Sequence, residues 1–71
     1  MTVKDRDRLL SGRQREILNL LSQGHKGPSI ASELGISVCT VRIHIRNAMQ
    51  KLEATNITHA VTRAFLSGLL N

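Results

Sequence analysis

With 71 residues, the chain has room for one small domain, which would bury only about 60% of the surface that its unfolded form exposes. Ten lysines and arginines outnumber five acidic residues, and the formal charge of +5 favours polyanionic partners such as nucleic acid. A single aromatic residue argues against binding RNA or single strands by base stacking, and a single cysteine excludes a secreted scaffold held by internal disulfides.

The amino-terminal residues 1–8 alternate in charge and lack the apolar core of a signal peptide. No apolar run approaches the roughly 20 residues that are needed to span a bilayer. We therefore expect a cytoplasmic protein with no membrane contact. In it, a flexible segment over residues 1–8 precedes one folded domain over residues 9–71.

The first helix is predicted at about residues 11–23. Ser11 and Gln14 have the spacing of a capping box, in which the serine hydroxyl accepts from a first-turn amide and the glutamine bonds back. Gly24 ends this helix, because glycine readily adopts the left-handed conformation of a helix stop. The apolar residues of one face are Ile17, Leu18 and Leu21.

A second helix is predicted from Pro28, whose missing N–H costs nothing in a first turn, to about Leu34. Gly35 then allows a tight turn, and Ser37 caps a third helix that continues to about Glu53. The sequence thus predicts a helix, a tight turn and a longer helix.

The third predicted helix has two different faces. At 100° per residue, its core face spans roughly 60° and consists of Val41, Ile45, Ala48 and Leu52. A separate arc, about 100° wide, carries Cys39, Arg42, Ile43, Arg46 and Gln50. No acidic residue occurs between Glu33 and Glu53. A helix that is apolar on one side and cationic on the other is suited to the DNA major groove.

A fourth helix is predicted after a cap at Asn56 or Thr55, and it ends at Gly68, with Leu69 and Leu70 packing back. Its apolar side consists of Ala60, Val61, Ala64, Phe65 and Leu66. The chain contains no strand pattern and no repeat, so the predicted fold class is all-α: a four-helix domain of the helix-turn-helix type.

Arg42 and Arg46 lie four residues apart, one turn along the polar arc, and are candidates for contact with guanine O6 and N7 or with phosphate. The alternative is a solvated basic face. Ile43 lies on the same arc, where it either contacts a thymine methyl group or is a scattered surface isoleucine. Gln50 is a further candidate because it shares the arc.

The start of the third helix supplies more candidates for the DNA interface. Ser37 is interpreted as the cap, and Thr40 as a donor to a phosphate at the helix amino terminus. Cys39 is interpreted as a small residue beside the DNA, with a redox-sensitive contact as the alternative. His44 lies between the two faces and is interpreted as a packed neutral histidine that bonds to backbone or phosphate.

The sequence offers no catalytic or metal-binding constellation. Cys39 and His44 are five residues apart, so they diverge by about 140° on a helix and cannot share a metal ion. His25 and His59 have no cysteine or carboxylate partner at ligand spacing. We therefore expect no enzyme activity, no metal and no cofactor.

Several short motifs occur along residues 10–70: Leu10-Ser11 with Arg13, Glu16-Ile17-Leu18, Leu21 with Gly24, Ile30-Ala31 with Leu34, Ile36-Ser37, Thr40-Val41-Arg42 with His44, Lys51-Leu52, Ala60-Val61 with Ala64, and Gly68-Leu69-Leu70. In order and spacing, this series resembles the LuxR/GerE/NarL-type helix-turn-helix domain of bacterial transcription regulators. The resemblance implies that the third helix recognises double-stranded DNA, at short repeats near promoters. It further implies that Arg42, Ile43 and Arg46 reach base edges or nearby phosphates.

The chain departs from the family at two places. Gly27-Pro28-Ser29 stands where the family usually has Asn-Lys-Glu, whose lysine commonly contacts phosphate, and Lys26 is the candidate to replace that contact. Gln14 stands where the family usually has Glu, so a charge that would favour the helix dipole is lost.

The resemblance also implies that the fourth helix can mediate dimerisation. The small side chains of this helix would permit the close approach of a second helix. They belong to Ala60, Val61 and Ala64. We expect a weak homodimer that is stronger on DNA, and contact with RNA polymerase is a further candidate partnership. The alternative is that this stripe belongs entirely to the core of the monomer.

Two other classes of function compete with a transcription regulator. One is a helix-turn-helix of a different machine, such as a promoter-reading region of a sigma factor or the binding module of a recombinase. The other is a protein-interaction module that uses the fourth helix and binds no DNA.

Overall fold

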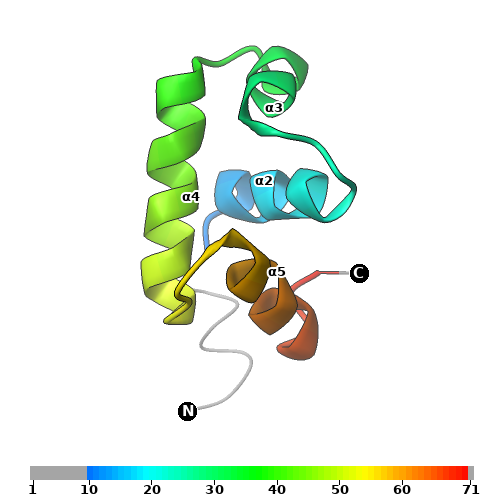
Figure 1. Cartoon of the computed structure of the whole chain (residues 1–71), viewed down its shortest axis with the longest axis vertical. Helices are drawn as coiled ribbons and strands as arrows, with labels where there is room; N and C mark the ends of the chain where they lie inside the picture. The colour runs from blue at the N-terminus through cyan, green and yellow to red at the C-terminus, as the bar shows by residue number, and fades with distance from the viewer. Residues whose placement is uncertain (1–9, 71) are drawn as a thin grey trace.

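The computed structural model describes residues 10–70, and this part of the chain consists of four helices without a strand (Figure 1). They are α2 (Gly12–Ser22), α3 (Gly27–Leu34), α4 (Val38–Leu52) and α5 (Ile57–Leu66). The all-α prediction is confirmed, and each predicted helix is present within about one or two residues of its expected bounds. The segment 1–8, predicted to be flexible, lies outside the described residues.

The longest helix, α4, stands along one side of the molecule and contacts α2, α3 and α5 on its inner side (Figure 1). Its predicted core face is confirmed, since Val41, Ile45, Ala48 and Leu52 are all buried. Two apolar clusters lie against this face. One joins α2, α4, α5 and the carboxy-terminal Leu69 and Leu70, and the other joins α2, α3 and the first half of α4.

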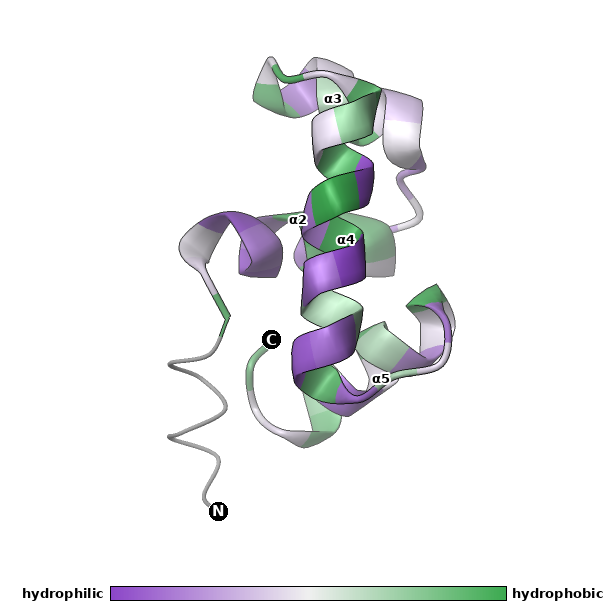
Figure 2. Cartoon of the chain, turned by 90° about the vertical axis from the view of Figure 1, so that its left-hand side faces the viewer, coloured by the Kyte–Doolittle hydropathy of each residue, from purple (hydrophilic) through white to green (hydrophobic). Residues whose placement is uncertain are grey.

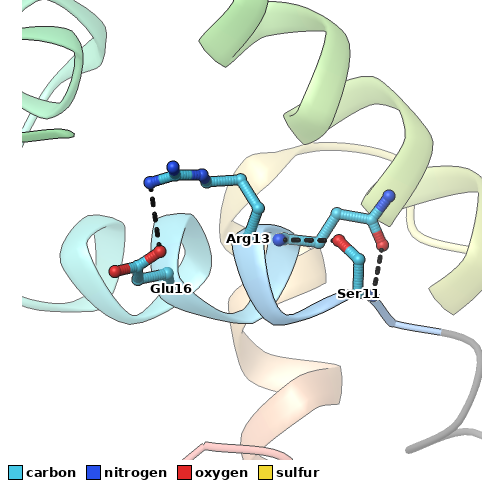
Figure 3. Close-up of polar contacts among 4 residues, drawn as sticks. Ser11, Arg13 and Glu16 are labelled. Atoms are coloured by element: carbon cyan, nitrogen blue, oxygen red, sulfur yellow. Dashed lines mark hydrogen bonds and ion pairs between the residues drawn. The ribbon is translucent and has the colours of Figure 1, made fainter. Parts of the chain in front are cut away.

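Side-chain caps start three of the helices, as predicted. At α2, Ser11 Oγ accepts from Gln14 N at 3.0 Å, while Gln14 Oε1 accepts from Ser11 N at 3.0 Å, so the capping box is complete (Figure 3). Ser37 caps α4 and Asn56 caps α5 in the same way, with one side-chain bond each. These bonds satisfy amide groups that a helix start otherwise leaves without a partner.

The turn between α3 and α4 depends on Gly35, whose φ of +68° lies in the left-handed region. The Ile36 amide bonds back to the Ala31 carbonyl at 3.0 Å, which closes the end of α3. The end of α4 has the same backbone pattern, with Ala54 N bonded to Met49 O at 2.9 Å. There, however, Glu53 occupies the left-handed position, at φ +55°.

The predicted apolar side of α5 needs a correction. Ala60 and Ala64 are fully buried in the core, but Phe65 is 42% exposed and Leu66 is 82% exposed. A step of 100° per residue carries positions 65 and 66 away from the face that contacts α2 and α4. The core therefore takes only a narrow stripe of α5 and leaves its larger apolar residues outside.

Candidate nucleic-acid interface

The outer side of α4 is open along its whole length. Figure 2 looks onto this side and shows α4 in front, with hydrophilic turns between apolar ones and no other helix over it. All five residues of the predicted polar arc are exposed: Cys39, Arg42, Ile43, Arg46 and Gln50. Because the opposite face of α4 is buried against three helices, this arc is the part of the helix that can enter a groove in a partner.

Arg42 and Arg46 carry the positive charge of the arc. They lie four residues apart on α4, and within residues 10–70 neither guanidinium has an ion-pair or hydrogen-bond partner. Ile43 lies beside them and is 50% exposed, so its side chain is available for an apolar contact. Two guanidinium groups, each with several N–H donors, and one apolar side chain can therefore contact the same partner surface.

The first turn of α4 holds the smaller candidates. Ser37 Oγ lies 2.9 Å from Thr40 Oγ1 and also accepts from Thr40 N, so both hydroxyls belong to the cap. Cys39 is a free, exposed cysteine at this end of the helix. His44 is half-buried between the outer arc and the core, which agrees with the predicted position.

Lys26 lies outside α4, at the residue before α3, where it is exposed and caps the helix with its backbone alone. The neighbouring Gly27 is near the start of α4, since a Cβ added there would lie 3.8 Å from Val38 Cγ1. Lys26 is therefore close to the amino-terminal end of α4, and it is separate from the two arginines further along that helix.

Lys51 has a structural partner, although it belongs to the run of residues without acidic side chains. Its Nζ donates to Gln14 Oε1 at 3.1 Å, so it links the last turn of α4 to the start of α2. Among the lysines and arginines of α4, Arg42 and Arg46 are thus the two without a hydrogen-bond or ion-pair partner in the described part of the chain.

A groove of about 660 Å³ lies between α4 and the beginning of α5. From α4 it is lined in part by Arg42, Arg46 and Met49, and from the following turn and α5 by Thr55, Ile57 and Thr58. The residues from α5 were not among the sequence-based candidates, because only their position after the turn brings them beside α4. The polar residues Thr55, Asn56 and Thr58, which follow the basic helix along the chain, were the available signal.

Two further findings concern the described residues, 10–70. They contain no group of three or more histidine, cysteine, aspartate or glutamate residues placed to hold a metal ion. None of their helices is both long and apolar enough to cross a membrane.

Residues 8–64 match the family model described as bacterial regulatory proteins, luxR family. The chain belongs to this family. Transcription regulators of the LuxR/GerE family bind DNA through their helix-turn-helix domain, which here is built around α3 and α4. The match supports a transcription regulator over the sigma-factor and recombinase alternatives.

GerE is similar to this chain in both sequence and structure. The spore germination protein GerE of Bacillus subtilis is 48% identical over 62 residues, which cover 87% of this chain and 84% of GerE. The solved structure of the transcription factor GerE superimposes with a TM-score of 0.85 at 40% identity, covering 89% of this chain and 94% of that one. This likeness supports the helix-turn-helix fold as well as the family.

Other LuxR-family relatives are much longer than the match. The transcriptional activator protein CarR of Pectobacterium carotovorum is 44% identical over 59 residues, which are 83% of this chain but 24% of CarR. The response regulator protein VraR of Staphylococcus aureus is 39% identical over 62 residues, 87% of this chain and 30% of VraR. The chain thus spans about a quarter to a third of these two proteins.

Proposed function

We propose that this LuxR-family chain binds specific sequences of double-stranded DNA, with α4 in the major groove, and so regulates transcription. The observation that carries the proposal is the outer arc of α4, where two unpaired arginines flank an exposed isoleucine on the side away from the core. A helix with its side chains is about 10–12 Å wide and fits a major groove about 12 Å wide.

Each side chain of the arc has a natural contact in that groove. The guanidinium groups of Arg42 and Arg46 can bond in pairs to guanine O6 and N7, and Ile43 can cover a thymine methyl group. The Gln50 amide can bond to adenine N6 and N7, if α4 lies deep enough. A good bidentate contact discriminates between bases by about 1–3 kcal/mol, so these residues would choose the sequence.

Phosphate contacts would set the register of α4 on the duplex. Thr40 and His44 are half-buried between the arc and the core face, and Cys39 lies at the amino-terminal end of the arc, where the helix dipole attracts a phosphate. Lys26, just before α3, would contact the backbone from the neighbouring helix. The proposal includes a cytoplasmic location, where the bacterial chromosome lies, and contact with RNA polymerase at the regulated promoter.

We also propose a weak homodimer through α5, with a surface that shares only Val61 with the predicted one. Ala60 and Ala64 are fully buried, so their stripe belongs to the core of the monomer. On the outside of α5, Ile57, Val61 and Phe65 follow one another at intervals of four residues and form a row that we call the α5 ridge. Ile57 and Phe65 are each 42% exposed.

Two α5 ridges can pack in antiparallel orientation about a twofold axis. The axis would pass near Val61, the middle residue, so that Ile57 of one copy meets Phe65 of the other. Two domains paired in this way would read half-sites about one helical turn apart, roughly 34–36 Å.

The decisive experiment is selection of bound duplexes from a random DNA pool, at moderate salt, for wild type, Arg42→Ala and Arg46→Ala. Arg13→Ala is the matched control, because it removes one exposed arginine from α2, where Arg13 pairs with Glu16 at 3.2 Å. Wild type and the control should enrich the same repeated motif, and each α4 variant should lose preference at its own base positions. An unchanged motif in both α4 variants would contradict base reading by α4, and no enrichment by wild type would contradict sequence-specific binding.

A further inference from the structure

The groove between α4 and α5 is continuous with the outer arc of α4, because Arg42 and Arg46 belong to both. Its other side comes from the α4–α5 turn and the first residues of α5. Thr55, Ile57 and Thr58 line it there, and all three are exposed. None of the residues that line the groove is acidic, so both its charge and its position are suited to a polyanion.

We propose that the sugar-phosphate backbone of one DNA strand lies in this groove, so that the start of α5 is a second DNA contact. This inference rests on the proposed function. A helix that fills the major groove has a strand backbone close to each of its flanks. The start of α5 lies along one flank of α4, on the side of the two arginines, and would therefore meet the nearer backbone.

The chemistry of the groove matches a deoxyribose-phosphate chain. Met49 offers apolar surface to the C–H groups of the sugars, and the two arginines offer charge to the phosphates. Thr58 is the free donor, since its hydroxyl has no hydrogen-bond partner among residues 10–70. The Thr55 hydroxyl, by contrast, lies 3.3 Å from His59 Nδ1. Such contacts carry no base information, so α5 would add affinity and orientation without changing the preferred sequence.

The test places charges of both signs at Thr58 and compares them with the same charges one turn further along α5. Thr58→Lys and Thr58→Glu change the groove, and Thr62→Lys and Thr62→Glu are the matched controls. Thr62 is also exposed on the same helix but does not line the groove. The measurement is the affinity of each variant for the duplex that wild type selects, at several salt concentrations.

Thr58→Lys should tighten binding about 2- to 5-fold at low salt, and Thr58→Glu should weaken it by a similar factor, the range of an exposed ion pair. Thr58→Lys should also make the dependence of log K on log salt steeper by about 0.9, because one more phosphate is neutralised. Both Thr62 variants should stay close to wild type. The motif selected from a random pool should be the same for all of them.

Opposite effects of the two Thr58 charges cannot arise from a folding defect, which would weaken binding in both variants. If the Thr58 pair behaves like the Thr62 pair, the backbone does not lie in the groove, and a small apolar acid or a second copy of the chain becomes the better occupant. The Arg42→Ala and Arg46→Ala variants separate the two proposals. If these two variants bind DNA weakly while the Thr58 variants bind like wild type, α4 reads DNA and only the assignment of the groove is wrong.

Discussion

Gln14 and Lys51 are joined across the domain by a hydrogen bond of 3.1 Å, from the lysine ammonium to the glutamine side-chain oxygen. The same oxygen accepts from Ser11 N at 3.0 Å, and Gln14 is only 6% exposed. One buried amide oxygen thus completes the cap of α2 and holds the last turn of α4. This bond adds a polar link between α2 and α4 to the apolar contacts of the core.

Gln14→Glu should stabilise the domain. The new carboxylate would accept the same two hydrogen bonds. It would also form an ion pair with the Lys51 ammonium and would place a negative charge in the first turn of α2, where the helix dipole favours it. Both effects favour a negative charge, and we expect the free energy of unfolding to rise by about 1 kcal/mol at pH 7. Because the charged form is the one stabilised, the gain should disappear as the pH falls below roughly 4. Urea unfolding at pH 7 and pH 3.5 measures both quantities.

The control for this prediction is Lys51→Met, made alone and together with Gln14→Glu. If the gain comes from pairing with Lys51, it should shrink to a few tenths of a kcal/mol without the lysine, the remainder being the helix dipole. A gain of the same size in both backgrounds would contradict the pairing.

Glu53→Gly should also stabilise the domain, through the backbone. Glu53 ends α4 at φ +55°, a conformation that costs a non-glycine residue about 1–2 kcal/mol, while Gly35 ends α3 in the same conformation without that cost. We expect a net gain of roughly 0.5–1 kcal/mol in the free energy of unfolding, after the greater chain entropy of glycine is counted. Glu53→Ala is the control, since it removes the charge but keeps the Cβ. Equal stabilities of the two variants would contradict the net gain expected from relieving the left-handed conformation at residue 53.

Ile57→Glu and Phe65→Lys should each weaken self-association when present alone, because each puts a charge opposite an apolar side chain of the other copy. Mixed together, they should associate again, since the twofold packing places residue 57 of one copy against residue 65 of the other. Sedimentation equilibrium on each variant and on the mixture measures this. Leu66→Lys is the control, because Leu66 is 82% exposed but lies off the α5 ridge. Failure of the mixture to associate would contradict the antiparallel register.

Ile43→Ala should remove the preference for a thymine methyl group at one position of the bound site. Replacing thymines of the selected duplex by uracil, one at a time, deletes only that methyl group. Wild type should lose up to about 0.8 kcal/mol of binding free energy at one position, the value of one buried methylene-sized group, and Ile43→Ala should lose nothing further there. If wild type is indifferent to every uracil, Ile43 is a scattered surface residue.

Local chemistry accounts for what the sequence alone made predictable. The caps at Ser11, Ser37 and Asn56 each act within three residues, and the turn at Gly35 needs only its own backbone freedom. The buried and exposed faces of α4 follow from 3.6 residues per turn. For this reason the helix bounds, and the exposed positions of Arg42 and the rest of the arc, could be predicted without any knowledge of the packing.

Tertiary structure alone decided which residues from distant parts of the chain meet. Lys51 meets Gln14, 37 positions away, only because the fold brings the end of α4 to the start of α2. Ala60 and Ala64 were candidates for a dimer contact until α5 packed on α2 and α4 with that stripe inward. The groove beside Arg46 exists only because α5 turns back along α4. Helical periodicity predicts which residues share a face of a helix. Which residues that face contacts depends on the angles at which the helices pack, and the packing of the whole core sets those angles.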